Sequence, residues 1–397
     1  MAGRHAHPSS GSTPTSPKVL AAMAAVLCAV GLAMVALWPD GSTASGRPGA
    51  QQVNGVVDDV ERQSCPASAE PQPGSPSAGA PGSTACGTAQ VRLTSGPQSG
   101  NTFTVPLPSG VGAPQVSAGD EITMAYSPES SPASRYAILD HQRGTQLWVL
   151  LAAFALSVVA FGRWRGVSAL LGLGVTFTVI IGFVIPAVLG GRPPLAVAVV
   201  GCSAIVLVVL YLTHGLGRTT TVALAGTLAS LLLTGLLAAV SVSVMRLSGA
   251  GDESSYILGQ SQGIDLRGLL LAGILIGSLG VLDDVTVTQA VTVDELARAN
   301  PEFSARELYA AATRVGRAHI ASVINTIVLA YAGASLPLLV LIVALDDPVR
   351  DILTDQLVAT ELVRSAVGTM GLIAAVPLTT AAAAFLARRP RSGVSPA

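Results

Sequence analysis

Long apolar runs constrain this chain more than any other feature of its sequence. From residue 147 onward, stretches of about 20 apolar residues recur, which is the length that an α-helix needs to cross a bilayer. Backbone polar groups inside a bilayer must hydrogen-bond internally, so such runs predict transmembrane helices. Charged residues make up 11% of the chain, less than half of the roughly 25% that is typical of soluble domains. We therefore expect an α-helical integral membrane protein.

The apolar runs predict about eight transmembrane helices, each roughly 20 residues long. The first run covers residues 19–38, and the others cover residues 146–162, 168–189, 195–213, 222–245, 268–288, 319–345 and 363–387. The first run is longer than the apolar core of a cleaved signal peptide, which has roughly 7–15 residues. We interpret it as an uncleaved anchor, with cleavage near Ala44 as the alternative.

The distribution of basic residues predicts the orientation. With the N-terminus inside, the expected inner segments hold most of the arginines, whereas the short outer loops hold few. This asymmetry follows the positive-inside rule. It predicts a multi-pass protein of the plasma membrane, in which a disordered N-terminus at residues 1–18 and a tail at residues 388–397 are both cytoplasmic. Residues 146–387 would form a seven-helix membrane domain with a cytoplasmic connection at residues 290–318, made of two short amphipathic helices that begin with capping boxes at Thr292 and Ser304.

Residues 39–145 have a different pattern and predict a small extracytoplasmic domain. Short alternating runs, typical of strands in a small β-barrel or sandwich, occur at residues 52–60, 90–93, 102–105, 121–126 and 136–139. We expect an all-β barrel of the oligonucleotide/oligosaccharide-binding type (OB-like), interrupted by a flexible insertion at residues 67–83. Cys65 and Cys86 are the only cysteines in this domain, and outside the cytoplasm they are expected to form a disulfide.

The run that begins at Gly268 gives the first candidate site. Its uninterrupted apolar part, residues 268–282, has 15 residues, or about 22 Å of helix. Crossing a hydrocarbon core takes roughly 20 residues, so the helix should continue beyond Leu282. Carboxylates inside a membrane are costly and by default indicate function. The continuation places a candidate ion or substrate path near the inner boundary, made of Asp283, Asp284, Thr286, Thr288 and Gln289.

The next helix offers partners for these carboxylates. Polar residues recur on it at three- and four-residue intervals and should form one stripe: His319, Ser322, Asn325 and Thr326. Arg314 and Arg317 precede the stripe and are candidate charge partners. Together these groups could carry a proton or coordinate a cation. Two simpler explanations stay open: the aspartates lie at a solvated helix end beside the two arginines, and the stripe serves helix–helix packing.

Five segments are long enough to be distinctive: residues 280–289 (GVLDDVTVTQ), 314–322 (RVGRAHIAS), 325–334 (NTIVLAYAGA), 356–361 (QLVATE) and 376–380 (VPLTT). Over residues 52–386 the chain resembles the YibE/F-like family of bacterial multi-pass membrane proteins. The family pattern has an aspartate after RVGR, where this chain has Ala318, which implies that the aspartate is dispensable. The resemblance implies the membrane topology but no particular activity, because the members have no firmly assigned one.

The remaining motifs exclude several classes of protein. No HExxH metal motif, nucleophile elbow or P-loop occurs in the sequence, so we expect no enzymatic activity, no cofactor and no metal site. The net charge of −1 and the lack of a basic patch argue against a nucleic-acid partner. We expect a permease or ion-coupled transporter of unknown substrate that lies in the lipid bilayer. The alternative is a non-transporting scaffold or sensor whose β domain binds a protein partner.

Overall fold

The chain folds into two compact units. The structure, a computed structural model, describes residues 17–39, 51–63, 86–109, 112–128, 135–251, 253–344 and 355–387. One unit comprises Ser45–Ala160, and the other comprises Met1–Ala44 together with Phe161–Ala397. The predicted insertion at residues 67–83 and the predicted tail at residues 388–397 lie outside the described residues. So does Cys65, and the predicted disulfide with it.

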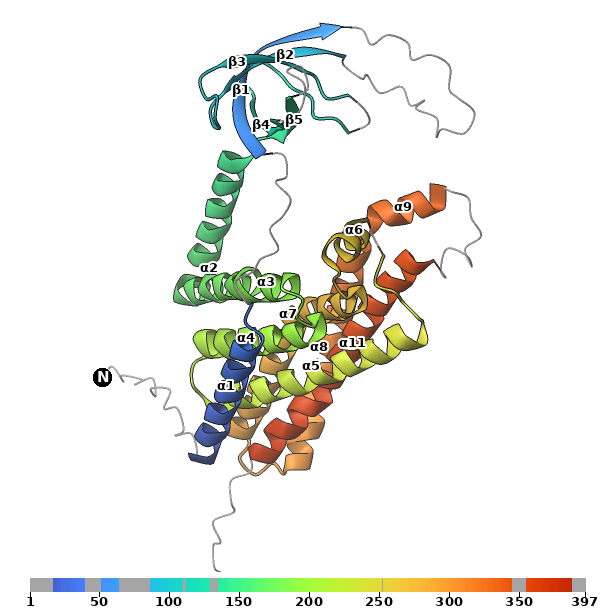
Figure 1. The fold of residues 1–397 in the computed structure, drawn as a ribbon. Helices are drawn as coiled ribbons and strands as arrows, with labels where there is room; N and C mark the ends of the chain where they lie inside the picture. The colour runs from blue at the N-terminus through green and yellow to red at the C-terminus, as the bar shows by residue number, and fades with distance from the viewer. Residues whose placement is uncertain are drawn as a thin grey trace, which may run out of the picture. The chain divides into compact units, whose positions relative to one another are not determined.

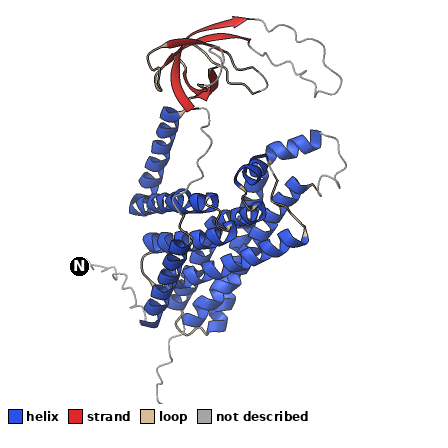
Figure 2. Ribbon diagram, in the orientation of Figure 1, coloured by secondary structure: helices blue, strands red, loops and turns tan. Residues whose placement is uncertain are grey.

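The first unit contains a small antiparallel sheet, as predicted (Figure 2). Its strands are β1 (Gln51–Gln63), β2 (Cys86–Leu93), β3 (Thr102–Pro106), β4 (Glu121–Tyr126) and β5 (Tyr136–His141). Their order is β3-β2-β1-β4-β5, and β3 also contacts β5. The long strand β1 therefore pairs with both β2 and β4.

Buried and exposed residues alternate along the strands, and the buried ones form the core of this sheet. On β1, Val53, Gly55 and Val57 are buried on one face, and they meet Val91 of β2 and Met124 of β4. A Cβ built on Gly55 would lie 2.6 Å from Cγ1 of Val91, so a larger residue would push β1 away from β2. Period-two patterns of this kind indicate which face is buried, which is why the strands were predictable from the sequence.

The second unit is helical, and α2 runs from one unit into the other. The helices are α1 (Pro17–Ala36), α2 (Gly144–Val179), α3 (Ile185–Leu189), α4 (Pro194–His214), α5 (Arg218–Val244), α6 (Glu253–Gln262), α7 (Leu266–Ala299), α8 (Ala305–Ala334), α9 (Leu336–Ala344) and α11 (Gln356–Leu386). A π-helical turn, η1 (Ile180–Val184), joins α2 to α3. Figure 1 shows their arrangement.

Six of the described helices are long and apolar enough to cross a membrane. The expected count of about eight is not confirmed. Two predicted spans, residues 146–162 and 168–189, lie in one stretch, Gly144–Leu189. Its backbone departs from helical geometry at Arg163, where φ is 51° and ψ is −129°. The first predicted span forms α1, but only Met23–Ala36 counts as an apolar helix, and it is shorter than the other six.

The prediction of two short helices at residues 290–318 is wrong, because α7 continues to Ala299 and α8 is one helix from Ala305 to Ala334. Thr292 does not cap a new helix, because its hydroxyl donates to the Thr288 carbonyl at 2.7 Å within α7. The chain leaves helical geometry at Asn300, since Pro301 disfavours the helical conformation of the residue before it. Ser304 does cap α8, and Glu307 completes the predicted capping box.

Three helices form the centre of the bundle: α5, α7 and α11 each pack along the other two. In Figure 1, α5 and α11 run side by side. The approach is close at two glycines, because a Cβ on Gly226 would lie 2.2 Å from Oγ1 of Thr379, and a Cβ on Gly371 would lie 2.0 Å from Oγ1 of Thr234. Glycine at helix interfaces in membranes permits such backbone approach.

We expect Gly371→Ala to destabilise the bundle by about 1–3 kcal/mol, because the added methyl group overpacks the contact with Thr234. Gly273→Ala is the matched control, since no atom lies within 4 Å of a Cβ built there. Thermal unfolding of the purified protein in detergent measures the difference. Adding Thr234→Ala to Gly371→Ala should recover part of the loss, and equal melting temperatures for the two glycine variants would contradict this packing.

In the sheet, burial raises the pKa of Tyr136. Its hydroxyl donates to Oε1 of Gln98 at 2.7 Å, and its ring packs against Phe103 at a centroid distance of 4.7 Å. A raised pKa favours the neutral phenol in the folded state. The contribution of Tyr136 to the stability of the fold is therefore complete below the ordinary tyrosine pKa of about 10. This contribution is lost as the pH rises through the higher pKa that Tyr136 has in the folded protein.

We therefore expect the strands to lose protection from hydrogen exchange as the pH rises above about 10. Tyr136→Phe should weaken this alkaline dependence and lower stability by about 1 kcal/mol through the lost hydrogen bond. The control is Tyr256→Phe, which changes an exposed tyrosine on α6. If Tyr136→Phe loses protection from hydrogen exchange at alkaline pH as much as the wild type does, Tyr136 is not the titrating group.

Candidate functional site

The two predicted aspartates lie within α7 and not at its end. Asp283 is half-buried and Asp284 is exposed, and the helix continues to Ala299. The continuation is stabilised because Val285, Ala290 and Val293 are buried against neighbouring helices. An oxygen of the Asp283 side chain accepts the backbone N–H of Asp284 at 2.8 Å. The simpler explanation that the helix ends at these aspartates is therefore contradicted, because α7 continues beyond them.

The expected charge partners do not meet these carboxylates. Arg314 and Arg317 are exposed on α8, and no ion pair joins either of them to Asp283 or Asp284 among the residues that the structure describes. The described part of the chain also contains no group of three or more His, Cys, Asp or Glu side chains that could hold a metal ion.

The predicted stripe on α8 is split between two environments. His319 is half-buried, and its Nε2 is buried without a hydrogen-bond partner among the described residues. Ser322, Asn325 and Thr326 are exposed. The reason is that α8 packs through another face, which carries Gly316, Ile320, Ile324 and Ile327. Among the described residues, no hydrogen bond or ion pair joins the stripe to the aspartates.

The other three predicted residues of α7 have different positions. Thr286 and Gln289 are 0% exposed, whereas Thr288 is half-buried. The hydroxyl of Thr286 lies 2.6 Å from that of Thr227 on α5, and the hydroxyl of Thr380 on α11 donates to Oε1 of Gln289 at 2.9 Å. Two of the predicted residues thus connect α7 to both of its central neighbours.

Most of the buried polar residues in this region were missed by sequence reasoning. We call the whole set the polar seam, and it lies between three helices: Thr227, Ser230 and Thr234 of α5, Ser278, Thr286 and Gln289 of α7, and Thr379 and Thr380 of α11. The residues from α5 have spacings of three and four, the same signal that singled out the stripe on α8. Applied to residues 222–245, it would have found them.

Hydrogen bonding in the polar seam is incomplete. The hydroxyls of Thr227 and Thr234 donate to carbonyls of their own helix, at 2.9 and 2.7 Å. Within the described chain, the hydroxyls of Ser230 and Thr379 and Nε2 of Gln289 are buried without a partner. Buried polar groups are nearly always paired in proteins, by ordered water if not by protein atoms. The seam can therefore accept further hydrogen-bonding groups.

A cavity of about 460 Å³ lies beside the seam between α8 and α11. Its lining includes Thr313, Arg317, Ile373 and Pro377. Because Pro377 has no N–H, the carbonyl of Ile373 loses its helical partner. The oxygen atom of Thr313 is also buried without a partner among the described residues. Of the predicted site residues, Arg317 thus borders a cavity that adjoins the middle of α11.

Comparison with known proteins identifies the helical part of the chain. The family model described as YibE/F-like protein matches residues 150–389, which is more than half of the 397 residues. The match covers the helices from α2 onward and leaves out the sheet, whereas the sequence motifs suggested a resemblance from residue 52. No curated protein and no solved structure matched the chain. The six apolar helices and the family match together show that this chain is a membrane protein and belongs to the YibE/F-like family.

Proposed function

We propose that this protein is a permease, and that the polar seam forms the central part of its transport path. The observation that supports this proposal is a set of buried hydroxyl and amide groups, several of them unpaired, between three helices of membrane-spanning length. Polar groups inside a membrane are costly and commonly line substrate or ion pathways.

The polar groups of α11 extend over most of a membrane's thickness. From Arg364 to Thr380 the helix rises about 24 Å, at 1.5 Å per residue, against about 30 Å for a hydrocarbon core. Along this length α11 presents Gly368 and Gly371, where it lies close to Ser278 and Thr234. A path between α5, α7 and α11 would therefore meet polar side chains or bare backbone through most of its length.

Asp283 is the candidate coupling residue. It is half-buried, and it lies one helical turn before Thr286 of the seam, whose hydroxyl donates to the Asp283 carbonyl at 3.0 Å. A carboxylate beside a polar path can bind a proton or a cation. Asp284 is exposed and is assigned no role in the path.

The location of the permease, the orientation of its termini and the role of its β domain are also proposals. The arginine distribution supports a plasma-membrane protein with both termini in the cytoplasm. The pairing of β1 with both β2 and β4, and the contact between β3 and β5, support an OB-like barrel. We assign this barrel a role in docking a protein partner, and we assign the protein no enzymatic activity.

A second candidate function is a membrane scaffold or sensor that transports nothing. The observation that favours it is the exposed face of α8, where Ser322, Asn325 and Thr326 point away from the bundle. Polar side chains on the outside of membrane helices are suited to hydrogen bonds with another helix. Under this proposal the seam is helix–helix packing, and α8 is the surface that recruits a partner.

Cysteine accessibility separates these two functions. In a variant with Cys28 and Cys202 replaced, single cysteines are placed at Ser230 and Thr379 of the seam. Matched controls at Leu231 and Ala375 are equally buried and come from the same helices. In a permease, a membrane-impermeant thiol reagent should label the seam positions about tenfold faster than the controls, because the reactive thiolate forms in water and not in apolar surroundings.

Labelling is measured in intact cells and in inverted vesicles, so that a path open to either side is detected. Asp284→Cys serves as the positive control, since this position is exposed. If the seam cysteines react no faster than Leu231→Cys and Ala375→Cys in both preparations, the seam is dry and the permease proposal is wrong. The scaffold proposal would then take its place.

A further inference from the structure

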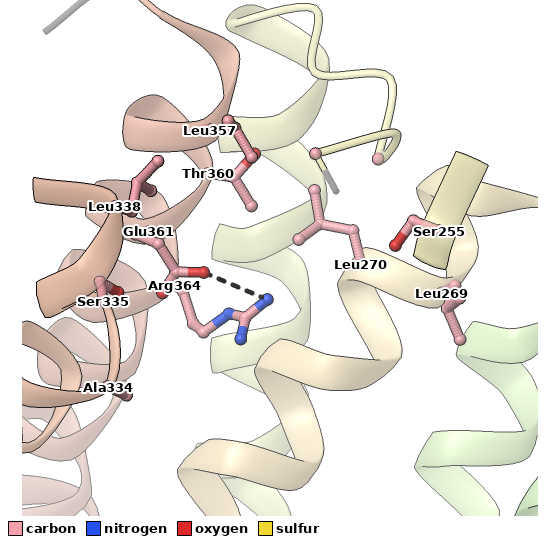
Figure 3. A pocket seen from close by; sticks show the side chains of 12 residues that line it. Ser255, Leu269, Leu270, Ala334, Ser335, Leu338, Leu357, Thr360, Glu361 and Arg364 are labelled. Atoms are coloured by element: carbon pink, nitrogen blue, oxygen red, sulfur yellow. Dashed lines mark ion pairs between the residues drawn. The ribbon is translucent and has the colours of Figure 1, made fainter. Parts of the chain in front are cut away.

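A second cavity, the Arg364 pocket, lies where five helices end or begin. Its volume is about 410 Å³, and residues of α6, α7, α8, α9 and α11 line it. Four leucines, Leu269, Leu270, Leu338 and Leu357, form apolar parts of the wall. Figure 3 shows Arg364 and Glu361 side by side in the pocket, with Leu270 and Ser255 across from them. The volume is in the range of sites that hold small molecules, about 300–1,000 Å³.

The loop between α5 and α6 forms part of the pocket wall, and contacts with α7 and α11 hold it in place. Gly249 has a φ of 81°, and a Cβ there would lie 2.2 Å from the Leu266 carbonyl oxygen, so only glycine fits. Nε of Arg267 donates to the Leu247 carbonyl at 3.2 Å, and the amide of Gln356 donates to the hydroxyl of Ser248. These contacts fix residues 247–249 of the loop to the beginnings of α7 and α11.

The charged pair in the pocket has hydrogen-bonding capacity that is not used within the described residues. Nη2 of Arg364 lies 3.7 Å from Oε1 of Glu361, which makes an ion pair but is too long for a hydrogen bond. Their side chains are 32% and 30% exposed. In the part of the chain that the structure describes, Nε of Arg364 and Oγ1 of Thr360 are buried with no hydrogen-bond partner. A guanidinium has five N–H donors, so most of its bonding capacity is available to a ligand.

We propose that the Arg364 pocket binds a small zwitterion with an aliphatic side chain, of the chemical class of an α-amino acid. The ligand carboxylate would accept hydrogen bonds from Arg364, and its ammonium group would donate to Glu361. An α-amino acid carries both charged groups on one carbon, so it can reach two protein charges that lie side by side. The leucines of the wall would then contact its aliphatic side chain.

The charge balance of the pocket favours a zwitterion over a simple ion. Among the described residues that line the pocket, Arg364 and Glu361 carry the charges and together contribute no net charge, so these two residues favour neither a lone anion nor a lone cation. A phosphate at Arg364 would place a second negative group beside the Glu361 carboxylate, and like charges at that distance repel. An amine without a carboxylate would gain no hydrogen bond from the Arg364 guanidinium, so it would bind more weakly than a zwitterion.

The pocket and the polar seam both involve residues of α11. Arg364 is on the same helix as Gly368 and Gly371, which lie close to residues of the polar seam. The hydroxyl of Tyr331 on α8 would be 3.1 Å from a Cβ on Gly277 of α7. The role of the pocket as the entry site of a permease rests on the proposed function. The binding of a zwitterion in the pocket does not.

The test measures binding on the purified full-length protein in detergent, by thermal shift and isothermal titration calorimetry. Four probes separate the charge requirements: L-leucine, 4-methylpentanoate (no ammonium group), 3-methylbutylamine (no carboxylate) and inorganic phosphate. We expect L-leucine to bind and the other three to bind at least about tenfold more weakly, since hydrogen bonds to charged groups carry most of the affinity.

Variants of Arg364 and Glu361 then test whether these two side chains contact the ligand. Arg364→Gln and Glu361→Gln should each weaken L-leucine binding by about 10- to 100-fold. The matched controls Arg306→Gln and Glu302→Gln change exposed residues at the other end of α7 and α8 and should leave binding unchanged. If either pocket variant fails to fold, Leu338→Trp fills the cavity while both charges stay, and it should abolish binding.

Three results would overturn the proposal. They are no binding of L-leucine, equal binding of 4-methylpentanoate or phosphate, and unchanged affinity in Glu361→Gln. The second and third would indicate an anion site at Arg364. Binding of L-leucine to a protein whose seam cysteines stay unlabelled would support the pocket and reject the permease. A labelled seam without leucine binding would reject only the ligand class.

Discussion

The close packing of α5, α7 and α11 is the interaction on which the rest of the helical unit depends. Gly226 and Gly371 let α11 approach α5 so closely that threonine side chains fill the space where a Cβ would otherwise lie. Between apolar membrane helices the hydrophobic effect contributes little, so van der Waals contact and hydrogen bonds must hold them together. The contact between the hydroxyls of Thr227 and Thr286, whose oxygens lie 2.6 Å apart, and the hydrogen bond from Thr380 to Gln289 provide these links. α4 packs against α7, and α8 packs against α7 and α11.

This packing also explains why polar groups gather along α11. One face of the helix carries Arg364 near its beginning and Thr379 near its end, with glycines between them. The same face therefore belongs to the Arg364 pocket and to the polar seam. A ligand that bound at Arg364 would be placed at one end of a row of hydroxyls and bare backbone, which is the arrangement that a transport path needs.

The limits of the sequence prediction are clearest in α7 and α8. The apolar runs and the alternating strands are local patterns, so the helices and the small sheet could be predicted. The end of α7 could not, because Thr292 and Glu295 match a capping box although the helix continues through them. The helix continues because Val293 and its neighbours are buried against α5, α8 and α11, and such tertiary contacts outweigh a local capping preference.

The sequence by itself determined that this chain is a membrane protein of the YibE/F-like family with an additional small antiparallel sheet. It also identified Thr286 and Gln289, because the apolar run at residues 268–282 is too short to cross a bilayer and the helix had to continue through them. Only the tertiary structure decided which polar faces turn inward. Helical periodicity shows that Ser322, Asn325 and Thr326 share a face, and equally that Thr227, Ser230 and Thr234 do. In a membrane helix both the inner and the outer surface are apolar, so no hydrophobic contrast distinguishes the face that meets a neighbour.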